Sequence, residues 1–158
     1  ADAHIMAANL IQSGVKGYEI QRSIYEQQKL VSIMLLADVV KNLKHSNNMK
    51  VVWTVITQSK LKDIGATEND IDGITEYIRS IKDVEISFMI LELSSGAFRI
   101  NFRSSGNFSV NDIAEKFNGG GHKFAAGARL DENYNITDIE SSIIDKINIK
   151  IPGEINVN

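Results

Sequence analysis

Two strand-like runs joined by a very short turn limit the folds open to this chain of 158 residues. The runs "VEISFMILEL" and "AFRINFR" are rich in β-branched and aromatic residues, and only "SSG" separates them. A connection this short joins antiparallel strands, because parallel strands need a crossover of a dozen or more residues. The sequence therefore excludes an all-parallel sheet.

The segments around this hairpin predict an α/β fold. "KVVWTVITQ" and "AAGARL" are typical of further strands, whereas "SKLKDIG", "SVNDIAEKF" and "NITDIESSIIDKI" are typical of helices. We therefore expect a mixed sheet of four or five strands with flanking helices, preceded by a separate helical segment.

Short polar side chains indicate where these helices begin. We expect Ser109 to cap the second of them and either Asn135 or Thr137 to cap the last. Thr67, with Asp70 three residues later, resembles a capping box and predicts one more helix between the first two strands.

Residues 1–45 favour helices instead of strands. Their apolar residues recur at helical spacing, with a break at Gly14 and Gly17, and "KHSNN" at 44–48 ends the pattern with turn residues. We expect these helices to stand outside the sheet. Large exposed apolar faces are unusual on monomers, so we also expect self-association through them.

The charge is unevenly distributed. The formal net charge of −3 argues against a broad basic surface for long duplex nucleic acid. Residues 96–130 nevertheless hold five basic and two acidic residues, a local charge of +3 that suits a short anionic ligand. The chain has no cysteine, no signal-peptide pattern at its start and no apolar run of the ~20 residues that span a membrane. We expect a cytoplasmic protein.

A glycine triplet, Gly119 to Gly121, stands directly before His122 and Lys123. The commoner explanation of such a triplet is a loop with positive φ angles. Each glycine costs about 0.5–1 kcal/mol in backbone entropy relative to alanine, however. A functional interpretation explains this cost, because consecutive N–H groups without neighbouring side chains can converge on an anion. His122 and Lys123 would add further donors.

Arg103 and Ser104 end the strand that precedes this motif, and Ser105 follows them. Arginine makes bidentate contacts with phosphate, and hydroxyl groups suit its remaining oxygens. The residues therefore predict a phosphate site. The chain has no Walker or dinucleotide-binding glycine motif, and its histidines lack the spacing of a metal site.

The stretch "GGGHKFAAGA", preceded by "RINFRSSGNFSVNDIAEKF", resembles the DHHA1 domain of the DHH phosphoesterases, most closely the oligoribonuclease/pAp phosphatase branch. Residues 1–28 are similar to the helical end of that family's catalytic DHH domain, and residues 29–48 to the helix that joins the two domains. Residues 49–150 resemble the DHHA1 substrate-binding domain, and residues 151–158 are a tail.

The resemblance implies the substrate-binding part of an enzyme that degrades very short oligoribonucleotides and dephosphorylates pAp. Its substrates would be pAp and di- to pentanucleotides. Asn101 stands where the family often has serine, and Asn118 where it often has a fourth glycine; asparagine tolerates positive φ better than most residues. The expected substrate- and phosphate-binding residues are Asn101, Arg103, Ser104, Gly119, Gly120, Gly121, His122 and Lys123.

The resemblance also implies Mn²⁺, held by aspartates and histidines of the DHH domain. The chain contains no Asp-His-His motif. We therefore expect no catalytic or metal-binding residue within it, no hydrolysis by this chain alone, and a DHH domain as its partner.

Two alternatives remain open. A cyclic-dinucleotide phosphodiesterase branch shares "GGGH" but tends not to follow it with "AAG", so residues 125–127 favour the first branch. A stand-alone nucleic-acid-binding module, such as the DHHA1-like appendage of alanyl-tRNA synthetase, leaves residues 1–45 unexplained.

Overall fold

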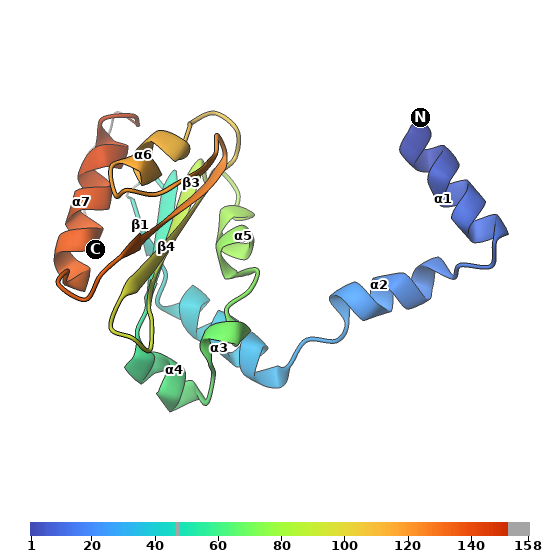
Figure 1. The fold of residues 1–158 in the computed structure, drawn as a ribbon, viewed down its shortest axis with the longest axis horizontal. Coiled ribbons are helices and arrows are strands. Elements are labelled where there is room, and N and C mark those ends of the chain that lie inside the picture. Colours follow the sequence, from blue (N-terminus) through green and yellow to red (C-terminus); the bar gives the residue numbers. More distant parts are fainter. Residues whose placement is uncertain (47, 152–158) are drawn as a thin grey trace.

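The computed structural model describes residues 1–46 and 48–151, and a mixed sheet forms its centre (Figure 1). The six strands lie in the order β1-β2-β3-β4-β6-β5. Only β2 and β3 pair in parallel; the other neighbours are antiparallel. The strands are β1 (Lys44–His45), β2 (Val51–Ile56), β3 (Ile86–Glu92), β4 (Phe98–Ser104), β5 (Gly120–His122) and β6 (Ala125–Leu130). The predicted mixed α/β fold is confirmed, and the sheet is wider than expected because β1 and β5 extend its two edges.

Helices cover both faces of this sheet. On one face lie α3, α4 and α5, and on the other lie α6 and α7 (Figure 1). The helices are α1 (Asp2–Gln12), α2 (Gly17–Tyr25), α3 (Leu30–Lys41), α4 (Gln58–Ile64), α5 (Ile74–Arg79), α6 (Asn111–Glu115) and α7 (Ile136–Asn148), and a 3-10 turn, η1, spans Glu68–Asp70.

Alternation along the strands produces two separate cores. In β4, Phe98, Ile100 and Phe102 are buried under α6 and α7, whereas the residues between them are half-buried on the opposite face. The rings of Trp53 and Phe88 stack in the same core with their centroids 5.5 Å apart. The second core joins the other face of β2 and β3 to α3, α4 and α5.

Local capping signals determine some helix ends. Gly65 ends α4 in the left-handed conformation, with φ of 77°. Asn135, rather than Thr137, caps α7, because its side chain accepts the N–H of Asp138 at 2.9 Å.

Tertiary contacts override two other predictions. Ser109 does not cap α6; the cap is the buried Val110, whose N–H donates to the carbonyl of Lys123 at 2.8 Å. The capping box of Thr67 and Asp70 exists, but it opens only the 3-10 turn η1. Gly73, with φ of 82°, separates this turn from α5.

The amino-terminal helices α1 and α2 bury no residue and project away from the sheet, as expected (Figure 1). The next helix differs, because α3 packs on the second core through Leu35 and Val39. Large apolar side chains of α1 and α2 are exposed: Ile5, Met6, Leu10, Ile11, Tyr18, Ile20, Ile24 and Tyr25. Self-association through them stays a prediction. None of the helices within 1–46 and 48–151 is long and apolar enough to cross a membrane.

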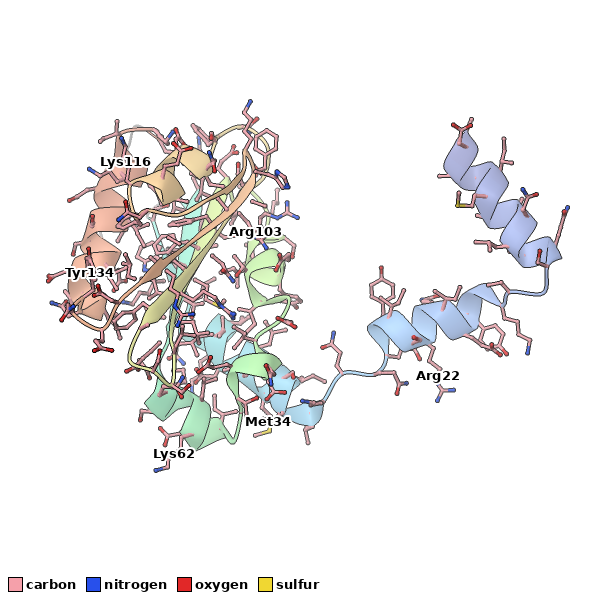
Figure 2. The ribbon with its side chains drawn as sticks, viewed as in Figure 1. Arg22, Met34, Lys62, Arg103, Lys116 and Tyr134 are labelled. Atoms are coloured by element: carbon pink, nitrogen blue, oxygen red, sulfur yellow. The ribbon has the colours of Figure 1, made fainter. Side chains whose placement is uncertain are left out.

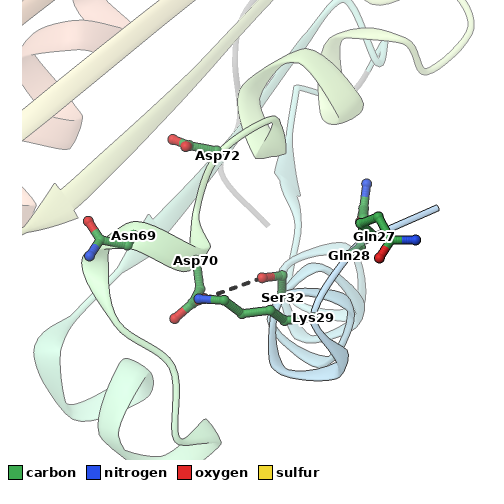
Figure 3. Close-up of a pocket in the computed structure, with 7 residues that line it drawn as sticks. All are labelled: Gln27, Gln28, Lys29, Ser32, Asn69, Asp70 and Asp72. Carbon is green, nitrogen blue, oxygen red and sulfur yellow. Dashed lines mark hydrogen bonds and ion pairs between the residues drawn. The ribbon is translucent and has the colours of Figure 1, made fainter. Parts of the chain in front are cut away.

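A buried carboxylate anchors the start of α3 to the sheet domain (Figure 3). Asp70 accepts the ammonium of Lys29 at 2.8 Å, and Ser32 Oγ lies 3.5 Å away. Thr67 donates both its N–H, at 2.9 Å, and its hydroxyl, at 2.7 Å. The Lys29 contact, followed by those of Thr67, lowers the pKa of the Asp70 carboxyl from 3.8 to about 2.

This contact predicts how stability depends on pH. Because the pKa is depressed in the folded state, the ionised carboxylate stabilises the fold fully above about pH 4, and this contribution is lost as pH falls towards about 2. At neutral pH we expect Asp70→Asn to unfold at lower urea than the parent, and the difference to shrink across that window. The buried Trp53, the one tryptophan of the chain, reports unfolding by fluorescence. A difference that stays constant from neutral pH to pH 2 would contradict the assignment.

Candidate functional site

Three neighbouring strands bring the residues around the glycine triplet into two rows. Arg103 of β4 pairs with Ala125 of β6, which pairs with His122 of β5. In the next row, Asn101 pairs with Gly127, which pairs with Gly120. Residues that pair directly share a face of the sheet, and so do residues two apart on a strand. Both rows therefore lie on the face that carries α5, and the exposed residues of β5 show that no helix covers this end. We call these two rows the β4–β6–β5 strip.

Arg103 is held in place at the end of the strip next to α5 (Figure 2). Its Nε lies 2.7 Å from Oε1 of Glu76 on α5, and its Nη1 donates to the carbonyl of Phe102 at 2.9 Å. A guanidinium carries five N–H donors in a rigid plane, so these two contacts fix its orientation and leave donors for a ligand. The chain separation between Glu76 and Arg103 explains why sequence reasoning missed this partner.

Two residues of the glycine triplet, Gly120 and Gly121, belong to an edge strand rather than to an anion-binding loop. Residues Gly120–His122 pair with β6, and the N–H of Gly119 donates to the carbonyl of Ala114 at 2.9 Å. The expected convergence of consecutive N–H groups on an anion is therefore not what the structure shows. The positive φ expected at Asn118 is present, at 54°.

Two of the three glycines are required by close packing. A Cβ at Gly119 would lie 2.2 Å from the carbonyl oxygen of Gly127, and a Cβ at Gly121 would lie 2.6 Å from that of Ala125. Gly120 differs, because a Cβ there would meet nothing within 4 Å and its φ is ordinary. The fold does not require glycine at Gly120, and its effect is to leave the strip bare beside the row of Arg103 and His122.

The remaining expected residues divide between the strip and other places. Ser104 points to the opposite face, where it is buried, and its Oγ accepts the N–H of Gly106 at 3.2 Å. It does not lie with Arg103. Lys123 is exposed at the turn between β5 and β6, with its ammonium 5.2 Å from the ring centre of Phe124.

Two further arginines lie on the same face as the strip. Arg99 of β4 pairs directly with Arg129 of β6. From the sequence, both arginines contribute only to the positive charge of residues 96–130, and neither is predicted as a site residue. The position of Arg99 could have been predicted. Arg99, Asn101 and Arg103 follow one another at intervals of two residues, and this spacing places all three on one face of a strand.

No group of three or more His, Asp or Glu side chains in the described ranges 1–46 and 48–151 could hold a metal ion. The Mn²⁺ site that the resemblance implies belongs to a DHH domain, and these residues do not themselves fit it.

The glycine geometry predicts opposite effects of two alanine substitutions. Gly119→Ala should lower the free energy of unfolding by about 1–3 kcal/mol or more, the usual cost of overpacking, because the new methyl group meets backbone on β6. Gly120→Ala should leave stability unchanged or raise it by up to ~1 kcal/mol, because the methyl group enters open space. Urea unfolding followed by Trp53 fluorescence measures both. Equal losses in the two variants would show that the contact of Gly119 with β6 is not as described.

Comparisons with known proteins agree with this fold. The bifunctional oligoribonuclease and PAP phosphatase NrnA of Mycoplasma genitalium is 31% identical over 98 residues, covering 62% of this chain and 30% of the relative. The NrnA of Bacillus subtilis is 28% identical over 124 residues, covering 78% of this chain and 38% of the relative. The chain thus spans about a third of the length of these curated relatives.

Solved structures share the same architecture. An exopolyphosphatase-related protein from Bacteroides fragilis matches 94% of this chain and 43% of its own, with a TM-score of 0.83 and 23% identity. The pGpG-specific phosphodiesterase PggH from Vibrio cholerae matches 94% of this chain and 52% of its own, with a TM-score of 0.56 and 13% identity. The family model described as the DHHA1 domain matches residues 48–148, more than half of the chain. The chain therefore belongs to the DHHA1 domain family.

Proposed function

We propose that this chain is the substrate-binding part of a phosphoesterase, and that the β4–β6–β5 strip holds the phosphate end of very short oligoribonucleotides and of pAp. The observation that carries the proposal is Gly120, a glycine that the fold does not require, exposed beside the row that contains Arg103 and His122. Bare backbone beside two potential cations suits a ligand that approaches closely and carries negative charge.

The chemistry of the row matches a phosphate group. Arg103 is oriented by Glu76, so its remaining donors are preorganised, and charge-assisted bonds of this type are stronger than neutral ones. His122 is exposed on β5, at the other end of the same row, and supplies a further donor. Asn101, in the adjacent row, can donate or accept through its amide. Ser104 is not included, because it is buried on the other face.

The relatives support the choice of substrate. Both curated relatives above are named for oligoribonuclease and PAP phosphatase activity. The structural likeness to the pGpG-specific phosphodiesterase, at 13% identity, supports only the shared fold, so it does not favour the cyclic-dinucleotide alternative. No observation favours the stand-alone nucleic-acid-binding module.

The proposal assigns hydrolysis to a DHH domain as partner. That domain would hold the Mn²⁺ ions, which supply an activated water and positive charge on the phosphoryl oxygens. The exposed apolar side chains of α1 and α2 are the surface that we propose for contact with it. The strip then binds and orients the substrate.

Calorimetry with pAp and with a 5′-phosphorylated dinucleotide tests the binding site. Arg103→Ala should weaken binding by about 1.5–3 kcal/mol, the range for hydrogen bonds to charged groups. Gly120→Val should weaken it as well by blocking close approach, without loss of stability, because the added side chain points into open space. Two matched controls should leave affinity unchanged. They are Arg22→Ala on the exposed helix α2, and Gly17→Val, since Gly17 also has an ordinary φ and open space around it. Unchanged affinity in both test variants would place the ligand elsewhere.

A phosphate-release assay tests the division of labour. With Mn²⁺ added, we expect this chain alone to release no phosphate from pAp and to leave short RNA intact, because arginine, histidine and backbone groups position a phosphate without activating water. Metal-dependent cleavage by the purified chain that His122→Ala abolishes would make the strip itself catalytic and would contradict the proposal.

A further inference from the structure

We infer that Arg99 and Arg129 form a second anion subsite, which takes an internal phosphate of the same oligoribonucleotide whose terminal phosphate lies at Arg103. This inference rests on the proposed function. It adds a preference for oligonucleotides over single nucleotides, and it assigns a role to two arginines that the first site leaves unused.

The two arginines stand opposite each other in the next row beyond the strip, after Asn101 and Gly127. Arg99 and Arg129 are directly paired across β4 and β6, and they share the face of Arg103. Arg103 and Arg99 are four residues apart on β4, which separates their Cα atoms by about 13 Å at the usual rise of a strand. Glu76 holds Arg103 towards α5, so the Arg103 guanidinium is not free to lean over to Arg99.

The surface next to the two arginines is hollowed, and two glycines contribute to its lining. A shallow hollow is lined by Arg99, Asn101, Gly119, Gly127 and Arg129, together with backbone of Ile100 and Ala128. Gly127 pairs with Gly120, so the bare backbone of the hollow continues into the strip described above. A chain of nucleotides can therefore lie along the strands from one cationic end to the other.

The charges at this end take part in no ion pair within the described chain. Like charges directly opposite each other destabilise an antiparallel pair. None of the ion pairs found in 1–46 and 48–151 includes Arg99 or Arg129. Arg99 Nε is buried and has no hydrogen-bond partner among the residues that the structure describes. An anion between the two guanidinium groups would remove the repulsion.

Acidic groups close to these arginines do not pair with them. Asp131 and Glu132 line a hollow with Arg129, and Glu68 feels the charge of Arg99, yet none of them forms an ion pair with either arginine among the described residues. The pKa of Glu68 is lowered first by a hydrogen bond from the backbone of Ser94 and only to a smaller degree by the charge of Arg99. Glu68 Oε1 accepts the N–H of Ser94 at 2.7 Å and also contacts Gln58 at 3.3 Å. That carboxylate oxygen is thus already engaged by Ser94 and Gln58.

The separation between the two cationic ends determines which ligand fills both. One phosphate group cannot contact Arg103 and the Arg99–Arg129 pair together. In pAp the two phosphates are joined by a single ribose, so pAp occupies the Arg103 end alone. An oligoribonucleotide of several residues places its terminal phosphate at Arg103 and a later phosphate of its backbone between Arg99 and Arg129.

Binding of two ligands to one set of variants tests the inference. The ligands are pAp and a 5′-phosphorylated tetraadenylate; the variants are Arg99→Gln, Arg129→Gln and, as a matched control on an exposed helix, Arg22→Gln. We expect each of the first two to weaken tetraadenylate binding about tenfold or more and to leave pAp binding unchanged. The slope of log affinity against log salt should fall by about 0.7 in magnitude for each phosphate that the variant no longer neutralises. Urea unfolding monitored at Trp53 checks that both variants remain folded.

The outcomes separate this inference from the proposed function. Equal effects on both ligands, no effect on either, or an unchanged salt slope would overturn the second subsite. Loss of pAp binding in Arg103→Ala would in each of these cases still support the first site. If Arg103→Ala altered neither ligand while Arg99→Gln weakened tetraadenylate, the arginine pair would stand as an anion site and the proposed terminal site would fail. Failure of the unaltered chain to bind either ligand would overturn both.

Discussion

Backbone contact between the glycine triplet and β6 is the constraint on which the candidate site depends. Gly119 and Gly121 lie so close to β6 that a Cβ atom at either position would overlap backbone atoms. This approach lets β5 join the edge of the sheet, while the N–H of Gly119 ties the start of the strand to Ala114 at the end of α6. His122 is brought into the row of Arg103 only because this pairing forms.

Patterns confined to short stretches predicted most of the fold. The β3–β4 hairpin, the strand β6 and the end of α4 at Gly65 follow from residue type and local spacing, and the structure contains each. Residue type left the cap of α7 open between Asn135 and Thr137, and the structure shows Asn135. Arg103 and His122 were also predicted as neighbours. Arg103 ends a predicted strand and His122 belongs to the glycine motif that follows it along the chain. The register of β4, β6 and β5 then places the two residues in the same row.

What could not be predicted depends on contacts between distant segments. Three consecutive glycines show no alternation of apolar and polar residues, so the sequence alone does not predict β5. The strand forms by pairing with β6. Glu76 meets Arg103 through the packing of α5, for which the sequence has no local signal. Ser104 is a different case: it directly follows Arg103 on a strand, and the alternation of faces alone would have placed it on the opposite side.

The two faces of β4 and β6 link the exposed strip to the interior behind it. Phe102 and Ala126, which alternate with the strip residues along these strands, belong to the core under α6 and α7. Close-packed interiors respond to changes of even one methylene group and transmit the resulting strain. The packing of this core therefore helps to determine the spacing between Arg103 and His122. Changes of side-chain volume at Phe102 or Ala126 should alter ligand affinity, although neither side chain can contact the ligand.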